Sequence, residues 1–389
     1  MKNLILSSFI VAGAAIGSGV LALPLVADAP GVLNSLIFIT ITFALAMTTA
    51  LISVNVYSTY KTHDINAATI AKEHFGTTGY TITTILNFLS MGSLAAAYVN
   101  VGGDLISHTI LPAFGINISP SIGMMIFFLI FMPAFVLGIN AISRLNGIIF
   151  AVKFICLISA ILIGSKFINV NELNFMPENI KYIGSGASTF FCIWMMHMTI
   201  PLVLKINDWN IKKAKQALFL GLLIPAIAYI SWLLLVFSLV PRSAVLNIHT
   251  VAGLIHTALD NQTIPHIVGK LIEVFASITV LTAFFSIGFS LVAFVMDAFS
   301  LKDGYKGRFI ATVLSFSIPI AIAASLPDAF VMIYKQSNMF QIGASLIPVA
   351  AALKLKSSNK IVISFTLIAC LTIILMQILD NFSILPVLK

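Results

Sequence analysis

Gly13-Ala14-Ala15-Ile16-Gly17-Ser18-Gly19 lies in the middle of an apolar stretch that runs from about residue 5 to residue 27. Glycines destabilise a helix but let the backbone turn freely. The triplet 17–19 therefore predicts a break, with uncovered amides that attract a carboxylate at the N-terminus of the second half-helix. A second interpretation stays open for Gly13 and Gly17, because small residues spaced by four also allow close helix packing.

The composition decides which solvent surrounds this stretch. Of the 389 residues, 59% are hydrophobic and 9% are charged, and the mean hydropathy is +1.07. A soluble domain carries about 25% charged residues. This composition excludes a soluble enzyme, a disordered chain and a nucleic-acid binder, and it predicts an all-α integral membrane protein.

Eleven windows are long and apolar enough to cross a bilayer as helices. They are joined by short connections, so we expect one membrane domain spanning residues 1–389. The predicted spans are 5–27, 33–57, 80–107, 121–140, 146–166, 186–205, 216–240, 266–298, 308–326, 329–353 and 361–380.

Basic residues predict the orientation of these spans. Of the 21 lysines and arginines, 14 fall on the side of the N-terminus, five on the other side and two within or near spans. Since basic loops mark the cytoplasmic face, we expect a cytoplasmic N-terminus and an external C-terminus. A signal peptide ending at Ala27-Asp28-Ala29 is the alternative for the first span, but Lys2 alone is a weak cationic region and ten spans follow.

The sixth span predicts a second break. It contains His197 and Pro201 after the small polar residues of Ser185–Thr189. Pro201 lacks an amide proton and leaves the carbonyl four residues earlier without its usual donor. Breaks in the first and sixth spans are what an inverted five-plus-five repeat produces. We therefore expect repeat one at about 5–166, repeat two at about 186–353 and an extra helix at about 361–380.

Several of these segments resemble the hydroxy and aromatic amino acid permeases, which include tyrosine- and tryptophan-specific transporters. The matching segments are 1–25, 96–104, 146–153, His197 with Pro201, and 224–232. The resemblance implies a LeuT-type fold with eleven spans, a bacterial inner membrane and proton-driven amino acid uptake. The family has glycines beside the histidine of the sixth span, where this chain has Met195 and Met198, so the identity of the amino acid stays open.

The two breaks predict the substrate site. We expect the substrate carboxylate at the amides of Gly17, Ser18 and Gly19. We expect its ammonium at carbonyls near Ala14 and around Phe190 to Cys192. The aromatic residues nearest the breaks are candidates for a side-chain pocket: Tyr98, Phe190, Phe191 and Trp194.

Ionisable residues inside spans predict the coupling groups. Lys153 lies in the fifth span, either buried as a coupling cation or extended to the surface. In proton-coupled relatives a lysine there replaces a bound sodium ion, which favours coupling. His197 is the second candidate, either as a proton carrier or as a neutral histidine bonded to a carbonyl. Thr282 and Ser286 share a face and either contact Lys153 or bond to their own helix.

These features predict a proton-coupled symporter that imports a hydrophobic, aromatic amino acid, with lipid, amino acid and proton as its partners. A sodium-coupled carrier and a carrier of non-aromatic neutral amino acids of the same fold are the alternatives. A channel and an intramembrane enzyme are more distant, because there is no filter or charge ring, no HExxH and no GxxxxGK[ST]. No cofactor or metal site is expected, and the oligomeric state stays open.

Overall fold

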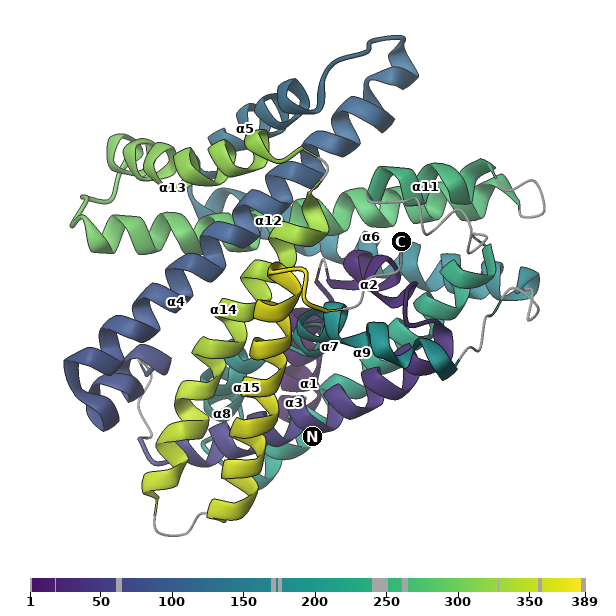
Figure 1. The fold of residues 1–389 in the computed structure, drawn as a ribbon. Coiled ribbons are helices and arrows are strands. Elements are labelled where there is room, and N and C mark those ends of the chain that lie inside the picture. The colour runs from purple at the N-terminus through teal and green to yellow at the C-terminus, as the bar shows by residue number, and fades with distance from the viewer. Residues whose placement is uncertain are drawn as a thin grey trace. The chain divides into compact units, whose positions relative to one another are not determined.

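The computed structural model describes residues 2–17, 19–60, 65–168, 173, 177–239, 251–260, 265–327, 329–355 and 359–385 (Figure 1). All regular elements in these ranges are helices. The α-helices are α1 (Lys2–Ala15), α2 (Gly19–Ala27), α3 (Val32–Tyr57), α4 (Ala67–Leu105), α5 (Pro120–Leu137), α6 (Ile139–Gly164), α7 (Ala187–Cys192), α8 (Ile200–Ile206), α9 (Ile211–Leu239), α11 (Val251–Asp260), α12 (His266–Ala298), α13 (Tyr305–Ser325), α14 (Phe330–Ala351) and α15 (Lys360–Asn381).

Short 3-10 or π-helical segments extend several of these helices. They are the π-helical turn η1 (Ile106–Ile110) and the 3-10 segments η2 (Pro112–Phe114), η3 (Ser165–Phe167), η5 (Pro177–Gly186), η6 (His197–Thr199) and η7 (Ala352–Lys354).

The helices overlap the predicted spans, although α4 begins 13 residues and α6 seven residues before the predicted start. The span predicted at 266–298 has the bounds of α12, and each of the other ten predicted spans overlaps one or more helices. Within the described residues, eight helical segments are long and apolar enough to cross a membrane, and the bent pair α1 and α2 makes a ninth. α6 and α14 occupy the other two predicted positions, so the all-helical membrane fold is confirmed although the count of eleven spans is not reached by this criterion.

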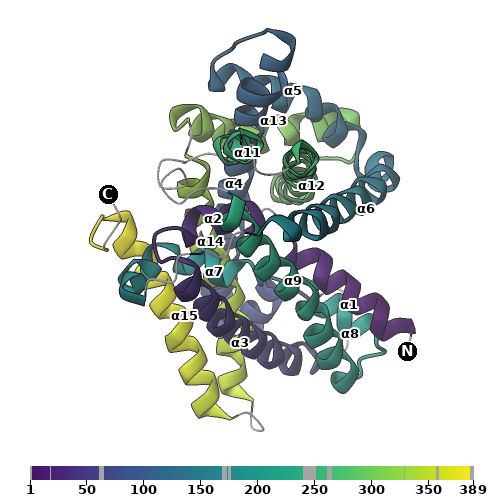
Figure 2. The same ribbon diagram turned by 90° about the vertical axis from the view of Figure 1, so that its right-hand side faces the viewer.

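The chain forms two compact units, each assembled from separate stretches of sequence. Unit 1 comprises Met1–Asn87, Asn174–Leu233 and Asn338–Lys389. It combines helices from both predicted repeats with the extra helix α15, and α3 packs against α7, α8 and α15 (Figures 1 and 2). The repeat relation itself stays a prediction.

Unit 2 comprises Phe88–Leu173 and Leu234–Ser337 and is held together by aromatic packing. In it, α12 packs against α6, α13, α11 and α5. Phe135 of α5 contacts Phe284 of α12 at 5.3 Å and Phe316 of α13 at 5.1 Å between ring centroids. Gly288 makes this approach possible, because a Cβ there would lie 2.4 Å from the Phe135 ring.

Both predicted helix breaks are present, and both lie in unit 1. α1 ends at Ala15 and α2 begins at Gly19, with a bend of 52° between the two helices. α7 ends at Cys192, and α8 begins at Ile200 after the short turn η6. The LeuT-type expectation of an interrupted first and sixth helix is therefore confirmed.

Candidate functional site

The first break begins where the regular hydrogen bonds of α1 stop. The amide of Ile16 still donates to the carbonyl of Ala12, but the amide of Gly17 donates to Ala15, only two residues back, at 2.7 Å. The amide of Gly17 is thus engaged by the chain itself in this structure. Gly19 is buried and is the first residue of α2, and the amide of the next residue, Val20, donates to the carbonyl of Gly17 at 3.4 Å. Ser18, the third residue of the predicted carboxylate site, lies outside the described residues.

Tyr229 of α9 joins the two breaks. Its hydroxyl lies 2.6 Å from the carbonyl oxygen of Ala15, at the end of α1, and 3.0 Å from that of Ile193, directly after α7. The side chain is fully buried. A phenol carries one proton, so the two carbonyls share a single donor. One side chain thereby holds two half-helix ends that are 178 residues apart in the sequence.

Trp232, three residues further along α9, satisfies another freed carbonyl. Pro24 lies inside α2 and has no amide proton to give to Val20, four residues earlier. The indole Nε1 of Trp232 donates to that carbonyl at 2.9 Å, and the indole is fully buried. α9 therefore supplies the hydrogen bonds that α1 and α2 cannot make for themselves.

Pro201 begins the second half of the sixth span. It is the second residue of α8, a position where a proline costs no hydrogen bond. Pro201 has no amide proton to donate to the carbonyl of His197. That carbonyl accepts instead from the amide of Ile200. The proline thus starts a helix, and the carbonyl predicted to be free is satisfied by a tighter turn.

The predicted aromatic residues of the sixth span are all fully buried. Phe190 contacts Phe38 edge to face at 5.5 Å. Trp194 contacts Phe43 at 5.2 Å and Tyr229 at 5.4 Å, and its indole Nε1 donates to the hydroxyl of Thr42 at 3.1 Å. Phe191 is buried on α7, the short helix that also carries Phe190. These side chains form the packed wall beside the break.

His197 contacts α3 through its ring. Its Nε2 lies 2.7 Å from the hydroxyl of Thr49. That hydroxyl also lies 2.8 Å from the carbonyl oxygen of Ala46, and when its only proton is on that carbonyl it accepts from an Nε2–H. Nδ1 is then a buried acceptor, and it has no partner among the described residues. The partner of His197 is a hydroxyl rather than the backbone carbonyl that the neutral interpretation expects.

The first half of the sixth span is also fixed by amide side chains. Ser188 donates to Gln377 of α15 at 2.6 Å, and Thr189 accepts from Asn338 of α14 at 3.2 Å. All four residues are buried. α15 therefore reaches the break region through a hydrogen bond as well as by packing.

The remaining predicted residues belong to unit 2. Lys153 of α6 is 3% exposed, which agrees with the buried interpretation rather than with extension to the surface, and its Nζ lies 5.7 Å from the centre of the Phe154 ring. α6 packs against α12, where Thr282 is buried and donates to the carbonyl of Thr279 at 3.1 Å. Ser286 is exposed, and Tyr98 is buried on α4.

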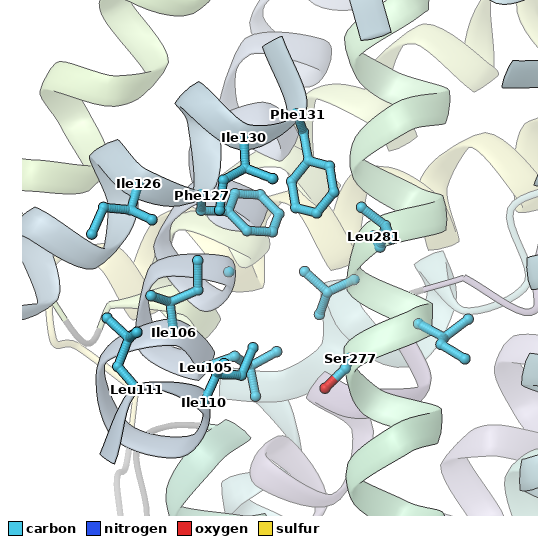
Figure 3. Close-up of a pocket in the computed structure, with 13 residues that line it drawn as sticks. Leu105, Ile106, Ile110, Leu111, Ile126, Phe127, Ile130, Phe131, Ser277 and Leu281 are labelled. Carbon is cyan, nitrogen blue, oxygen red and sulfur yellow. The ribbon is translucent and has the colours of Figure 1, made fainter. Parts of the chain in front are cut away.

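A cavity of about 310 Å³ in unit 2 contains none of the predicted site residues (Figure 3). Its walls come from α4 and η1, α5 and α12, and the labelled side chains that surround it are aliphatic or aromatic apart from Ser277. An amino acid carries two charged groups that need polar partners. The lining offers one hydroxyl and no charged side chain, so we do not assign the substrate site to this cavity.

The two methionines of the sixth span have different surroundings. Met195 is half-buried beside the break, whereas Met198 is 69% exposed. Met198 therefore fills no pocket in the described structure, and of the two only Met195 is placed to shape one.

Four residues that support the breaks were not among the predicted site residues: Tyr229, Trp232, Thr49 and Thr42. For Trp232 a signal existed, because Pro24 predicts that the carbonyl of Val20 needs a donor from elsewhere. For the other three the sequence holds no local signal, since their partners lie on distant helices.

Two interrupted helices inside a bundle of apolar helices define a class of protein, the integral membrane transporters with a LeuT-type fold. Within that class, the chain belongs to the tryptophan/tyrosine permease family, which matches residues 1–385. This is a family of permeases and not of enzymes, which confirms the resemblance seen in the sequence.

Individual relatives agree with this assignment. The chain is 28% identical to the tyrosine-specific transport system 1 of Haemophilus influenzae over 92% of this chain and 90% of that protein. It is 25% identical to glutamine transporter 2 of Aliivibrio fischeri over 91% and 89% of the two chains. Among solved structures, a manganese transporter of Eremococcus coleocola superposes with a TM-score of 0.58 at 15% identity, covering 97% of this chain and 85% of the other, which shows the shared fold.

Proposed function

We propose that this permease is a proton-coupled symporter that imports an aromatic amino acid across the bacterial inner membrane, with its N-terminus in the cytoplasm. The observation that carries the proposal is the pair of helix breaks whose ends meet at the Tyr229 hydroxyl. Half-helix N-termini attract a carboxylate and half-helix C-termini attract an ammonium. An amino acid carries both groups on one carbon.

The backbone at the breaks supplies the polar partners in this proposal. The substrate carboxylate binds the opening amides of α2 at Gly19, with Ser18 and with Gly17 once its amide leaves Ala15. The substrate ammonium binds carbonyls at the end of α1 around Ala14 and at the end of α7. Release of the bond between Gly17 and Ala15 on binding is part of the proposal.

The aromatic preference rests on the side chains around the breaks and on the family. Phe190, Phe191 and Trp194 pack beside the second break, and Tyr98 is the candidate from unit 2. Tyrosine-specific relatives support an aromatic substrate. The relative named as a glutamine transporter favours the alternative of a non-aromatic neutral amino acid.

Lys153 and His197 are the proposed coupling groups. Lys153 is a buried ammonium on a membrane helix, where a charge is costly and is kept for a function. Nδ1 of His197 is a buried acceptor that can take a proton. Thr282 and Ser286, on the helix against which α6 packs, are the proposed contacts of the coupling site.

Uptake into proteoliposomes tests the substrate and the driving ion separately. With an imposed pH gradient and no sodium, we expect accumulation of labelled tyrosine, inhibited by tryptophan and phenylalanine and not by glutamine. Absence of uptake of any aromatic amino acid contradicts the substrate. Uptake that requires sodium at a constant pH gradient contradicts proton coupling and favours the sodium-coupled alternative.

The Lys153→Gln variant tests the coupling group. We expect it to equilibrate substrate but not to accumulate it against a gradient. Lys270→Gln is the matched control, because about half of the Lys270 side chain is exposed, unlike that of Lys153, and its ammonium forms an ion pair with Glu273. Accumulation by Lys153→Gln at the rate of the control removes Lys153 from the mechanism.

A further inference from the structure

A second depression lies on the surface of unit 1. It has a volume of about 830 Å³ and is formed by α1, α3 and α9, which lie next to one another in Figure 2. We call it the α1–α3–α9 groove. Its lining residues are Leu4, Met47, Leu51, Ile211, Lys212, Lys215, Gln216, Phe219 and Leu220.

The chemistry of the groove changes along α9. Lys212, Lys215 and Gln216 lie in the first two turns of the helix, whereas Phe219 and Leu220 follow one turn later. Eight residues separate Lys212 from Leu220, a distance of about 12 Å along the helix axis. Leu51 and Met47 continue the apolar surface on α3. The basic end of the groove therefore continues into an apolar stretch. The length of the groove matches one lipid headgroup followed by the first part of its acyl chains.

Within the part of the chain that the structure describes, no ion pair neutralises the charge at this end of the groove. Between Lys205 and Gln216 the chain has four lysines and one acidic residue, Asp208. None of the ion pairs among the described residues includes Lys212 or Lys215. Phe219 and Leu220 are 48% and 44% exposed in a protein whose helices lie in a bilayer, so lipid is the medium that covers them.

We propose that the α1–α3–α9 groove binds an anionic phospholipid, with the phosphate between Lys212 and Lys215 and an acyl chain along Phe219, Leu220 and Leu51. Basic pockets between membrane helices at the membrane surface recognise anionic headgroups. The lysines supply the charge complementarity, and the apolar stretch distinguishes a lipid from a free phosphate. Trp209, in the turn that precedes α9, is a residue type that marks the headgroup level of a membrane protein.

Native mass spectrometry of the full-length protein in detergent tests the proposal. We expect one phosphatidylglycerol to remain bound at lipid concentrations at which phosphatidylcholine does not. Lys212→Gln with Lys215→Gln should weaken phosphatidylglycerol binding about thirty-fold, at about one kilocalorie per lysine. Phe219→Ser should also weaken it, and glycerol phosphate without acyl chains should not compete.

The matched control is Lys302→Gln with Lys306→Gln, which removes the same charge from two exposed lysines in unit 2. Binding that is equal for the two lipids overturns the proposal. An equal loss of phosphatidylglycerol binding in the control pair also overturns the proposal, as does competition by glycerol phosphate. Each of these results would show that charge attracts the lipid without a contribution from the groove. Unchanged binding in Phe219→Ser overturns it as well. The substitutions are at exposed or half-exposed positions, and unchanged melting temperatures establish that the variants fold.

Discussion

Unit 1 and unit 2 hold their helices together by different means. In unit 1 the interrupted helices depend on single hydrogen bonds from α9, through Tyr229 and Trp232. In unit 2 the helices of the aromatic cluster are continuous, and Phe135, Phe284 and Phe316 fill the space between them. A continuous helix satisfies most of its own backbone, apart from the carbonyls that Pro133 of α5 and Pro319 of α13 leave without an intrahelical donor. A broken helix in a membrane depends more strongly on donors from its neighbours.

The largest expected effect comes from Tyr229→Phe. The substitution removes the only proton shared by the carbonyls of Ala15 and Ile193. The Ala15 carbonyl keeps the amide of Gly17, whereas the Ile193 carbonyl is left without a donor among the described residues. An unsatisfied buried group costs about 1–3 kcal/mol, so we expect uptake to fall by about fivefold to 150-fold. The measurement is labelled tyrosine uptake normalised to folded protein. Uptake within twofold of the unchanged protein would show that the breaks do not depend on this hydroxyl.

Trp232→Phe should have a smaller effect of the same kind. It leaves one carbonyl, that of Val20, without its donor and keeps an aromatic ring in the same place. We expect uptake to fall about threefold to tenfold, corresponding to about 1 kcal/mol. The comparison with Tyr229→Phe checks the order, and a larger loss for Trp232→Phe would contradict the assignment of Tyr229 as the residue that joins both breaks.

Gly288→Ala addresses the packing of unit 2. The new Cβ would lie 2.4 Å from the Phe135 ring and 3.1 Å from that of Phe316. Overpacking of this kind costs about 1–3 kcal/mol, so the melting temperature should fall while the KM for uptake stays unchanged. Adding Phe135→Leu should restore part of the stability, and failure of this rescue would place the cause elsewhere.

Gly17→Ala should have the smallest effect. Among the described residues beyond its chain neighbours, the nearest atom to the new Cβ would be the carbonyl oxygen of Ala15 at 4.0 Å, and the backbone needs no left-handed conformation there. We expect the equilibrium constant for unfolding and the uptake rate to stay within about twofold of those of the unchanged protein, because the proposed contact is made by the backbone. The matched comparison is Gly221→Ala, whose Cβ would lie 2.6 Å from Val11 and 2.7 Å from the Ser8 carbonyl oxygen. Equal losses in the two variants would contradict the open space at Gly17.

The sequence predicted the features that depend on local composition. The bounds of α12, the break at Gly17–Gly19 and the division of the sixth span near His197 all follow from apolar length, glycine and proline. These signals work in a bilayer because an apolar run of sufficient length has few alternatives to a helix.

The residues that stabilise the breaks could not be predicted in the same way. The partners of Tyr229 lie 214 and 36 residues away, and Thr49 meets His197 across 148 residues. Which of eight tyrosines reaches a freed carbonyl depends on how whole helices pack, and no local pattern contains that information. The consequence of Pro201 was misjudged for a related reason, because the tighter turn that rescues the His197 carbonyl is set by the residues around it.

The hydrogen bond between Ser188 and Gln377 has a consequence for engineering this protein. A fluorescent reporter or a purification tag attached behind α15 is anchored to a helix whose buried amide touches the interrupted sixth span. Displacement of α15 by an attached protein would act on α7 through that bond. The N-terminus offers no better position, because α1 begins at Lys2 and ends at the first break. A tag on a long flexible linker is therefore the safer design for transport measurements.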